Sequence, residues 1–167
     1  MAQKFILAIA LGVMVALSSV SPLSAQGTSI ALTSSTYDNT LPVEVTADAL
    51  NVAQASNTAE FIGNAKAIQG DMRLGADKVV VTYNQEQSAI ETVVATGDVV
   101  FTNGTEVAEA SKAVYRIGSS EVVLTGNVLL LQGPNAISGD TLTLDLNTNK
   151  GSMRGHVKTV FVPKTDK

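Results

Sequence analysis

From Val43 onward, apolar and polar side chains alternate along most of the chain, and helical periodicity is nearly absent. Val43, Val45 and Ala47, for example, alternate with polar neighbours. Because successive side chains of a strand point to opposite faces, this period of two predicts strands with one apolar and one polar face. Val, Ile, Thr, Tyr and Phe fill these stretches, and Gly-Asn, Gly-Asp and Asn-Gly pairs separate them. The pattern predicts an all-β fold whose short connections join antiparallel neighbours.

The alternating stretches recur as blocks in a common register. Gly63, Gly97, Gly126 and Gly155 each begin a block, and Asn, Asp or His follows each of them. The blocks start 34, 29 and 29 residues apart, because one of them carries five extra residues near positions 84–88. With a partial block at the start, the chain holds about three and a half repeats. Repeats of this size indicate stacked units that bury a continuous apolar face only together.

Superposing the blocks places one set of apolar residues on a shared face. This face requires a second sheet to cover it, as in a sandwich, a jelly roll or a flattened solenoid, since almost no helix is available. The residues that point to the opposite face are mostly polar, with Val100, Leu129 and Leu131 as apolar exceptions. The predicted interior positions are Val45, Leu50, Val52, Phe61, Leu74, Val79, Val81, Tyr83, Val99, Phe101, Tyr115, Ile117, Leu124, Val128, Leu130, Ile137, Leu142, Leu144 and Leu146.

Small residues are frequent on the apolar face. The chain has no tryptophan, and several interior positions hold Ala, Gly or Thr, among them Ala65, Ala95 and Ala113. Two sheets pack about 10 Å apart when large side chains interdigitate. A face of small residues permits two alternatives: a thin, well-packed core, or an apolar groove between the sheets. The residues alone leave both open.

The chain begins with the features of a secretory signal. Lys4 provides a positive start, an apolar run extends from Phe5 to Val20, and small residues fill 21–25. The run is short for a membrane span of about 20 residues. We expect export with cleavage after Ala25. Residues 26–41 are rich in Ser and Thr without a sustained period and are predicted to form a loose leader. The β domain is expected over residues 42–163, followed by a short tail at 164–167.

Composition narrows the possible functions. The formal net charge of −4 argues against nucleic acid as a partner, because phosphate binding needs a basic stripe. The absence of cysteine excludes disulfides and cysteine-based metal or thiol chemistry. The fold therefore depends on packing and hydrogen bonds.

Candidate catalytic residues are few. His156 is the only histidine, and it occupies the position that Asn or Asp holds in other blocks, which favours a turn role. Asp48, Asp77 and Asp140 fall at equivalent positions of the repeat and are interpreted as corner residues rather than an acid/base pair. We predict no catalytic, metal or cofactor site, and a protein that is not an enzyme.

Several motifs, in order and in register, resemble the LptA family of periplasmic lipopolysaccharide-transport proteins, which share the OstA-like domain. The likeness extends over roughly residues 43–163. The motifs that carry it are the segments Thr46–Leu50, Phe61–Ala65, Gln69–Asp77, Ala95–Val99 and Leu124–Val128.

The resemblance implies a twisted, open-ended antiparallel β-jellyroll whose two sheets enclose an apolar groove for the acyl chains of lipopolysaccharide. The interior positions would then line a lipid path. It also implies a periplasmic protein that stacks head to tail and bridges two complexes. These are the inner-membrane lipopolysaccharide-transport anchor and extraction complex, and the outer-membrane lipopolysaccharide translocon. The alternative is a structural β-solenoid that binds sugar or protein and has a filled core.

Both ends of such a stack expose unpaired backbone. Bare strand edges recruit further strands, and joining two different ends produces a filament rather than a closed ring. The predicted assembly edges are Val43 and Val45 at one end, and Val160 and Phe161 at the other.

Overall fold

The computed structural model describes residues 28–31, 38 and 40–163. The predicted signal peptide and the C-terminal tail lie outside the described residues. Within them, the chain forms strands with one short 3-10 helix, and every strand pair is antiparallel, which confirms the predicted all-β fold. The elements are β1 (Thr28–Ala31), β2 (Glu44–Thr46), β3 (Ala49–Ala53), η1 (Gln54–Ser56), β4 (Thr58–Gln69), β5 (Met72–Tyr83), β6 (Ile90–Asn103), β7 (Glu106–Arg116), β8 (Glu121–Gln132), β9 (Asn135–Asp145), β10 (Lys150–Arg154) and β11 (Lys158–Val160).

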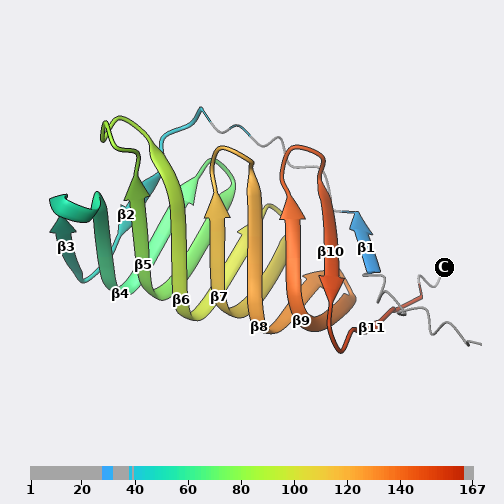
Figure 1. The fold of residues 1–167 in the computed structure, drawn as a ribbon. Coiled ribbons are helices and arrows are strands. Elements are labelled where there is room, and N and C mark those ends of the chain that lie inside the picture. Colours follow the sequence, from blue (N-terminus) through green and yellow to red (C-terminus); the bar gives the residue numbers. More distant parts are fainter. Residues whose placement is uncertain (1–27, 32–37, 39, 164–167) are drawn as a thin grey trace, which may run out of the picture.

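The long strands β4 to β9 bend in the middle, and each contributes one half to each of two layers (Figure 1). The strand register shifts at each bend, for example between Ile62 and Ala65 and between Thr96 and Val99. Layer A contains β2, β11 and the halves 65–69, 72–76, 99–103, 106–110, 128–132 and 135–139. Layer B contains β1, β3, β10 and the halves 58–62, 78–83, 90–96, 112–116, 121–125 and 141–145.

The bends of β4, β6 and β8 contain the glycines that begin the blocks, Gly63, Gly97 and Gly126. Gly97 and Asp98 both lie in the left-handed region, with φ of 79° and 41°, and Gly126 and Asn127 repeat this with 84° and 50°. Such a conformation is accessible to glycine and tolerated by Asn and Asp. Two consecutive left-handed residues insert a bulge and turn the strand sharply, so the repeated Gly-Asn and Gly-Asp pairs form a row of corners.

The corner aspartates face these glycines from the neighbouring strand. Asp48 Oδ2 accepts a hydrogen bond of 2.8 Å from Asn64 Nδ2, and His156 Nδ1 lies 2.7 Å from Asp140 Oδ2. His156 has a φ of 45° and therefore takes the corner position of Asn or Asp, as predicted.

The hairpins lie along the edge opposite the corners, the upper edge in Figure 1. In layer A they are two-residue turns at 70–71, 104–105 and 133–134, and their first residues are Gly70, Gly104 and Gly133 with positive φ. Glycine at the first central position is the requirement of a type II′ turn. The turns of layer B are longer, and the five extra residues of one block extend the turn between β5 and β6, where Asn84 Oδ1 accepts the N–H of Ser88 at 2.9 Å.

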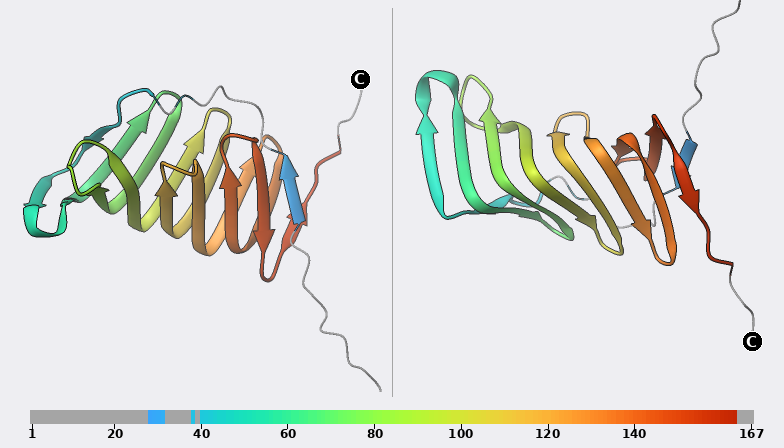
Figure 2. Two further views of the ribbon diagram at one scale, coloured as in Figure 1. Left: turned by 45° about the horizontal axis from the view of Figure 1, so that its top comes forward. Right: turned by 90° about the horizontal axis from the view of Figure 1, so that it is seen from below.

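β1 departs from the prediction that structure begins near Pro42. Four residues of the expected leader, Thr28–Ala31, pair in antiparallel register with β10. Ile30 is 5% exposed, so its side chain joins the core. Four residues are too few to show an alternating period, and the edge that they cover belongs to the far end of the chain. The views in Figure 2 show β1 beside β10 at that end.

Candidate functional site

The space between layers A and B is the continuous feature that all blocks share. Thirteen of the predicted interior positions are buried there, and Val45, Phe61, Tyr83 and Ile117 are half-buried against the same cluster. The buried ones are Leu74, Val79, Val81, Val99, Phe101, Tyr115, Leu124, Val128, Leu130, Ile137, Leu142, Leu144 and Leu146. These side chains point to the face of the strand that the alternating pattern predicted. Their role in lining a lipid path stays a prediction.

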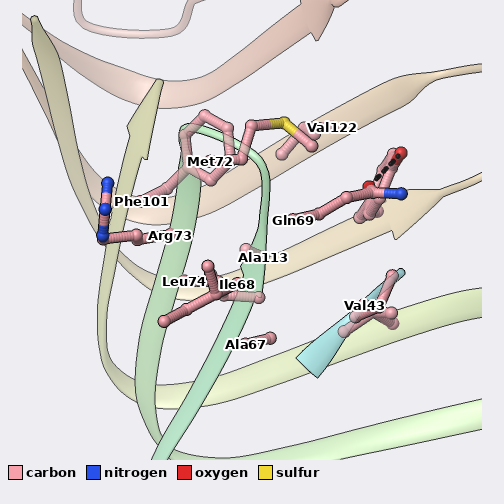
Figure 3. A pocket seen from close by; sticks show the side chains of 12 residues that line it. Val43, Ala67, Ile68, Gln69, Met72, Arg73, Leu74, Phe101, Ala113 and Val122 are labelled. Atoms are coloured by element: carbon pink, nitrogen blue, oxygen red, sulfur yellow. Dashed lines mark hydrogen bonds between the residues drawn. The ribbon is translucent and has the colours of Figure 1, made fainter. Parts of the chain in front are cut away.

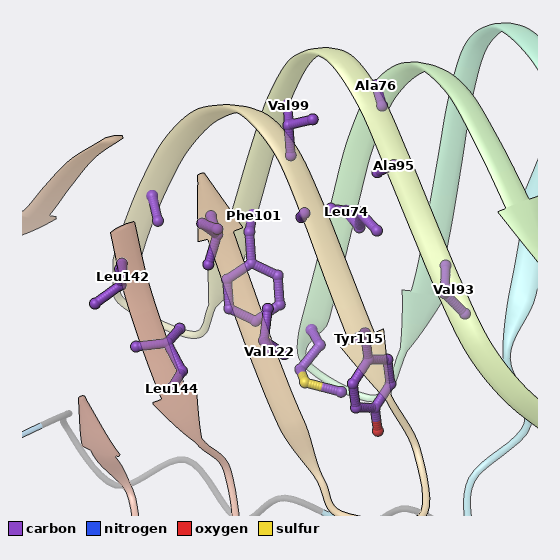
Figure 4. Close-up of a cluster of buried hydrophobic side chains, with 14 of the residues drawn as sticks. Leu74, Ala76, Val93, Ala95, Val99, Phe101, Tyr115, Val122, Leu142 and Leu144 are labelled. Carbon is purple, nitrogen blue, oxygen red and sulfur yellow. The ribbon is translucent and has the colours of Figure 1, made fainter. Parts of the chain in front are cut away.

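The middle of this interior is filled by the side chains of the protein. Leu124 and Leu142 are fully buried, and the small residues Ala95 and Ala113 are buried beside them in layer B. Figure 4 shows part of this buried cluster, with Phe101, Val122 and Leu142 among its labelled side chains. Of the two alternatives that the sequence left open, the thin, packed core describes the middle of the interior. A wide groove there was the other alternative, and the burial of these side chains argues against it.

A cavity of about 40 Å³, here called the rim cavity, lies between the layers next to the hairpins (Figure 3). Layer A contributes Gln69, Met72 and Phe101, and layer B contributes Tyr115 and Val122. One water molecule needs a cavity of about 10–15 Å³, so this space is too small for an acyl chain. The cavity marks a weakly packed place at the edge where the layers are not joined by backbone.

Side chains, not backbone pairs, connect the layers at this edge. Every strand pairing of the described residues joins strands within one layer, and the layers are continuous only through the corners. Tyr115 Oη donates to Gln69 Oε1 over 3.5 Å, and Gln132 Nε2 of layer A donates to the carbonyl of Ala31 in β1 over 2.9 Å. The layers are therefore joined covalently at the corners and linked at the hairpin edge by side-chain contacts such as these.

One end of the interior is uncovered. Among the described strands β3 pairs with β4 alone, and its inward-facing residues Leu50 and Val52 are 55% and 67% exposed. With Ala59, Phe61 and Tyr83 they line a hollow of about 290 Å³. We call this region the open end. Apolar surface of the interior thus continues into solvent beyond the first strand.

The opposite end of layer A also exposes apolar residues. Val160 of β11 is 50% exposed, and Phe161, which follows it, is 73% exposed. β11 pairs with β9 through three residues only. Of the four predicted assembly edges, Val160 and Phe161 are exposed, whereas Val43 and Val45 are half-buried beside β4.

The outer faces carry most of the charged residues, and Glu106, which is 4% exposed, is a buried exception. Lys78 Nζ lies 2.8 Å from Glu60 Oε1, and the hydrogen bond from this ammonium lowers the pKa of the Glu60 carboxyl. Arg116 forms a similar pair with Glu121 at 2.6 Å. Exposed pairs of this kind contribute little to stability. Of the three apolar exceptions on the outer face, Val100 and Leu131 are exposed on layer A, and Leu129 is half-buried.

Other kinds of site have little support in the described part of the chain. Across residues 28–31, 38 and 40–163, no group of three or more His, Cys, Asp or Glu is placed to hold a metal ion. Within the same ranges, no helix is long and apolar enough to span a bilayer.

Some residues of the interior are not among the positions predicted from the sequence. Val93 and Val122 are buried on the predicted parity, two residues before Ala95 and Leu124, so the repeat itself contained a signal for them. Met72 and Gln69 at the rim cavity begin or end a strand, where alternation is too short to assign a face. No pattern in the sequence around Ile30 predicted that this residue is buried.

Comparisons with known proteins agree with one another. The sequence model of a family described as "LptA/(LptD N-terminal domain) LPS transport protein" matches residues 44–150. "Lipopolysaccharide export system protein LptA" of Escherichia coli (strain K12) is 33% identical over 138 residues, which cover 77% of this chain and 75% of that protein. The protein of the same name from Haemophilus influenzae is 30% identical over 133 residues, which cover 73% of this chain and 77% of that protein.

A solved structure has the same fold. It is the crystal structure of LptH from Pseudomonas aeruginosa, described as the LptA homologous periplasmic component of the conserved lipopolysaccharide transport device. It matches with a TM-score of 0.69 and 18% sequence identity, and the match covers 75% of this chain and 99% of that one. The predicted open-ended β-jellyroll is therefore confirmed.

Proposed function

Because this chain belongs to the family of LptA and LptD N-terminal-domain LPS transport proteins, we propose that it carries lipopolysaccharide through the periplasm toward the outer membrane. The acyl chains lie between layers A and B during transport. One observation carries this proposal: the inner faces are apolar from β3 to β10 and remain uncovered at the open end. The names of the relatives, which describe lipopolysaccharide export and transport, support it.

An apolar interior supplies the free energy that such a lipid needs. Transfer of one methylene group from water gains about 0.8 kcal/mol, so a chain of about twelve carbons gains roughly 10 kcal/mol. Several chains per molecule make unescorted passage through water very slow. The sugars and phosphates of the lipid remain outside, at the hairpin edge, where the interior meets solvent.

Because the middle of the interior is filled, acyl chains require the layers to move apart. The corners act as the hinge, since each keeps the two halves of a strand covalently joined. The rim cavity lies at the free edge, beside the contact between Tyr115 and Gln69. We place the start of separation there.

Similar surroundings in successive blocks give small barriers between successive lipid positions but no direction. Energy for directed movement therefore comes from the partners. In this proposal the inner-membrane extraction complex delivers lipopolysaccharide, and copies of the chain stack head to tail toward the outer-membrane translocon. The open end of one copy, with Leu50 and Val52, meets the Val160 and Phe161 end of the next.

Photo-crosslinking tests the lipid path. A benzophenone amino acid at Phe101, which is buried at the rim cavity, is expected to capture lipopolysaccharide in cells, because acyl chains would lie against it. The matched control is the same residue at Thr82, which lies on the outward parity of β5 and should capture at least about tenfold less. The readout is a shifted band that reacts with an antibody to lipopolysaccharide.

Two results would oppose the assignment. Capture at Thr82 with none at Phe101 would reverse the assignment of faces. If both variants fold and neither captures lipid, the result would favour the alternative. That alternative is a structural β-solenoid that has a filled core and binds sugar or protein.

The assembly edge is tested by Val160→Asp. Val160 lies on the outer face of the edge strand β11, in register with Ala136, and a charge there should weaken self-association at least about tenfold, because an added strand would partly desolvate the carboxylate without giving it a partner. Val100→Asp is the matched control: Val100 is 40% exposed on the outer face of layer A, away from both ends, and this variant should associate as the unmodified chain does. Sedimentation velocity measures both, and equal association of all three proteins would refute the edge.

A further inference from the structure

The C-terminal edge of layer B is not free. β10 would be its last strand, but β1 pairs with it over four residues, Thr28↔Met153 to Ala31↔Lys150. Within residues 28–31, 38 and 40–163, layer A ends at β11, and no further strand pairs with that edge. The two layers therefore differ at the end where a second copy would dock.

β1 has the direction of an incoming strand. Neighbours alternate in direction across layer B, so β3, β5, β7 and β9 run one way and β4, β6, β8 and β10 the other. A second copy that continued this alternation would place its β3 antiparallel to β10. β1 already occupies that place in that direction.

β1 also closes the apolar interior. Ile30 lies opposite Gly151, where an added Cβ would be 3.4 Å from Ile30 Cβ and 3.1 Å from Leu144 Cδ2. Because Gly151 has no side chain, the Ile30 side chain can pack directly against it, next to the core. The hydrogen bond from Gln132 Nε2 to the Ala31 carbonyl ties β1 to the edge of layer A as well.

The open end has exposed apolar residues that a neighbouring strand could bury. Leu50 and Val52 of β3 alternate like a core-facing strand, yet nothing in the described structure covers them. Ile30 provides on β1 the same kind of inward apolar group. Pairing of β3 with β10 of another copy would bury Leu50 and Val52, because they would take the place that Ile30 of β1 now occupies.

We propose that β1 is a built-in edge cap that competes with β3 of a second copy for pairing with β10. This inference rests on the head-to-tail assembly proposed above and adds its regulation. While β1 is in place, a copy docks through layer A alone. Release of β1 makes the layer B edge available and uncovers the end of the interior, so the joint becomes continuous in both layers. The apparent affinity of assembly is reduced by the fraction of copies whose cap is closed.

A disulfide that locks the cap tests this directly. Ala31 and Lys150 are exposed register partners, antiparallel partners have Cα atoms about 4.5–5.5 Å apart, and this suits a disulfide. The chain has no cysteine of its own, so Ala31→Cys with Lys150→Cys gives one defined pair. In the exported chain from Gln26 onward, oxidation should weaken self-association at least about tenfold, and reduction should restore it.

Ile30→Asp tests the same cap in the opposite direction. A carboxylate cannot replace the buried isoleucine, so β1 should leave β10 and self-association should become about tenfold tighter. Adding Leu50→Asp to this variant should abolish the gain, because it blocks the incoming β3. Association that survives Leu50→Asp would be nonspecific and would count against the cap.

The outcomes separate this inference from the assembly on which it rests. If the unmodified chain associates but neither the lock nor Ile30→Asp changes its affinity, the cap is wrong and head-to-tail stacking stands. If neither the unmodified chain nor Ile30→Asp associates at any concentration, the stacking itself is wrong. A disulfide that links two chains, seen as a covalent dimer without reductant, would show β1 pairing between copies and would overturn the cap within one chain.

Discussion

Gly97→Val is expected to lower the free energy of unfolding by about 3 kcal/mol or more. Gly97 has a φ of 79°, which a β-branched residue adopts only with strain. A Cβ at this position would also overlap the carboxylate of Asp77 on the neighbouring strand. Because a domain of this size is stable by only about 5–15 kcal/mol, the loss should appear as a large shift of the urea midpoint.

Gly118→Ala is the matched control for this corner. Gly118 lies in the turn between β7 and β8, has no positive φ, and has no atom within 4 Å of an added Cβ. Its effect should stay within about 0.5 kcal/mol. Similar losses for both variants would mean that the corner at Gly97 is not as tight as the structure shows. In Gly97→Ala, the further change Asp77→Ser should recover part of the loss, since Ser already faces Gly126 in the equivalent corner.

The corners also show which parts of this fold are readable from sequence. The repeated glycines and the aspartate column predict bends and corner residues, because left-handed geometry restricts the residue type. The interior parity of residues such as Val81 and Leu144 follows from the period of two. The face of a residue is thus encoded locally, within one strand.

Other features depend on what lies across space. The sequence could not decide between a groove and a packed core, because that depends on how closely Ala95 and Ala113 allow the layers to approach. It could not find β1, since Ile30 acquires its meaning only from Gly151, far along the chain. Leu50 and Val52 have the same pattern as buried positions, and they are exposed only because the stack ends there.

Leu124→Ala is expected to lower the free energy of unfolding by about 2–5 kcal/mol. Leu124 is fully buried between the layers, and its truncation leaves a cavity that close-packed neighbours fill only partly. Leu50→Ala is the matched control, because the same side chain is 55% exposed at the open end and its loss should be within about 0.5 kcal/mol. Urea unfolding of the two variants, with the m-value checked for two-state behaviour, gives the comparison.

The difference between these two leucines decides how lipid enters. A large loss at Leu124 alone means that the layers are closed in the absence of lipid, so acyl chains must displace packed contacts as the layers separate from the hairpin edge. Binding then includes the free energy of opening, and the net affinity is smaller than methylene transfer alone predicts. A loss at Leu124 no larger than that at Leu50 would contradict the packed interior. The layers would then stand apart in solution already, and lipid would slide in from the open end without any separation at the rim cavity.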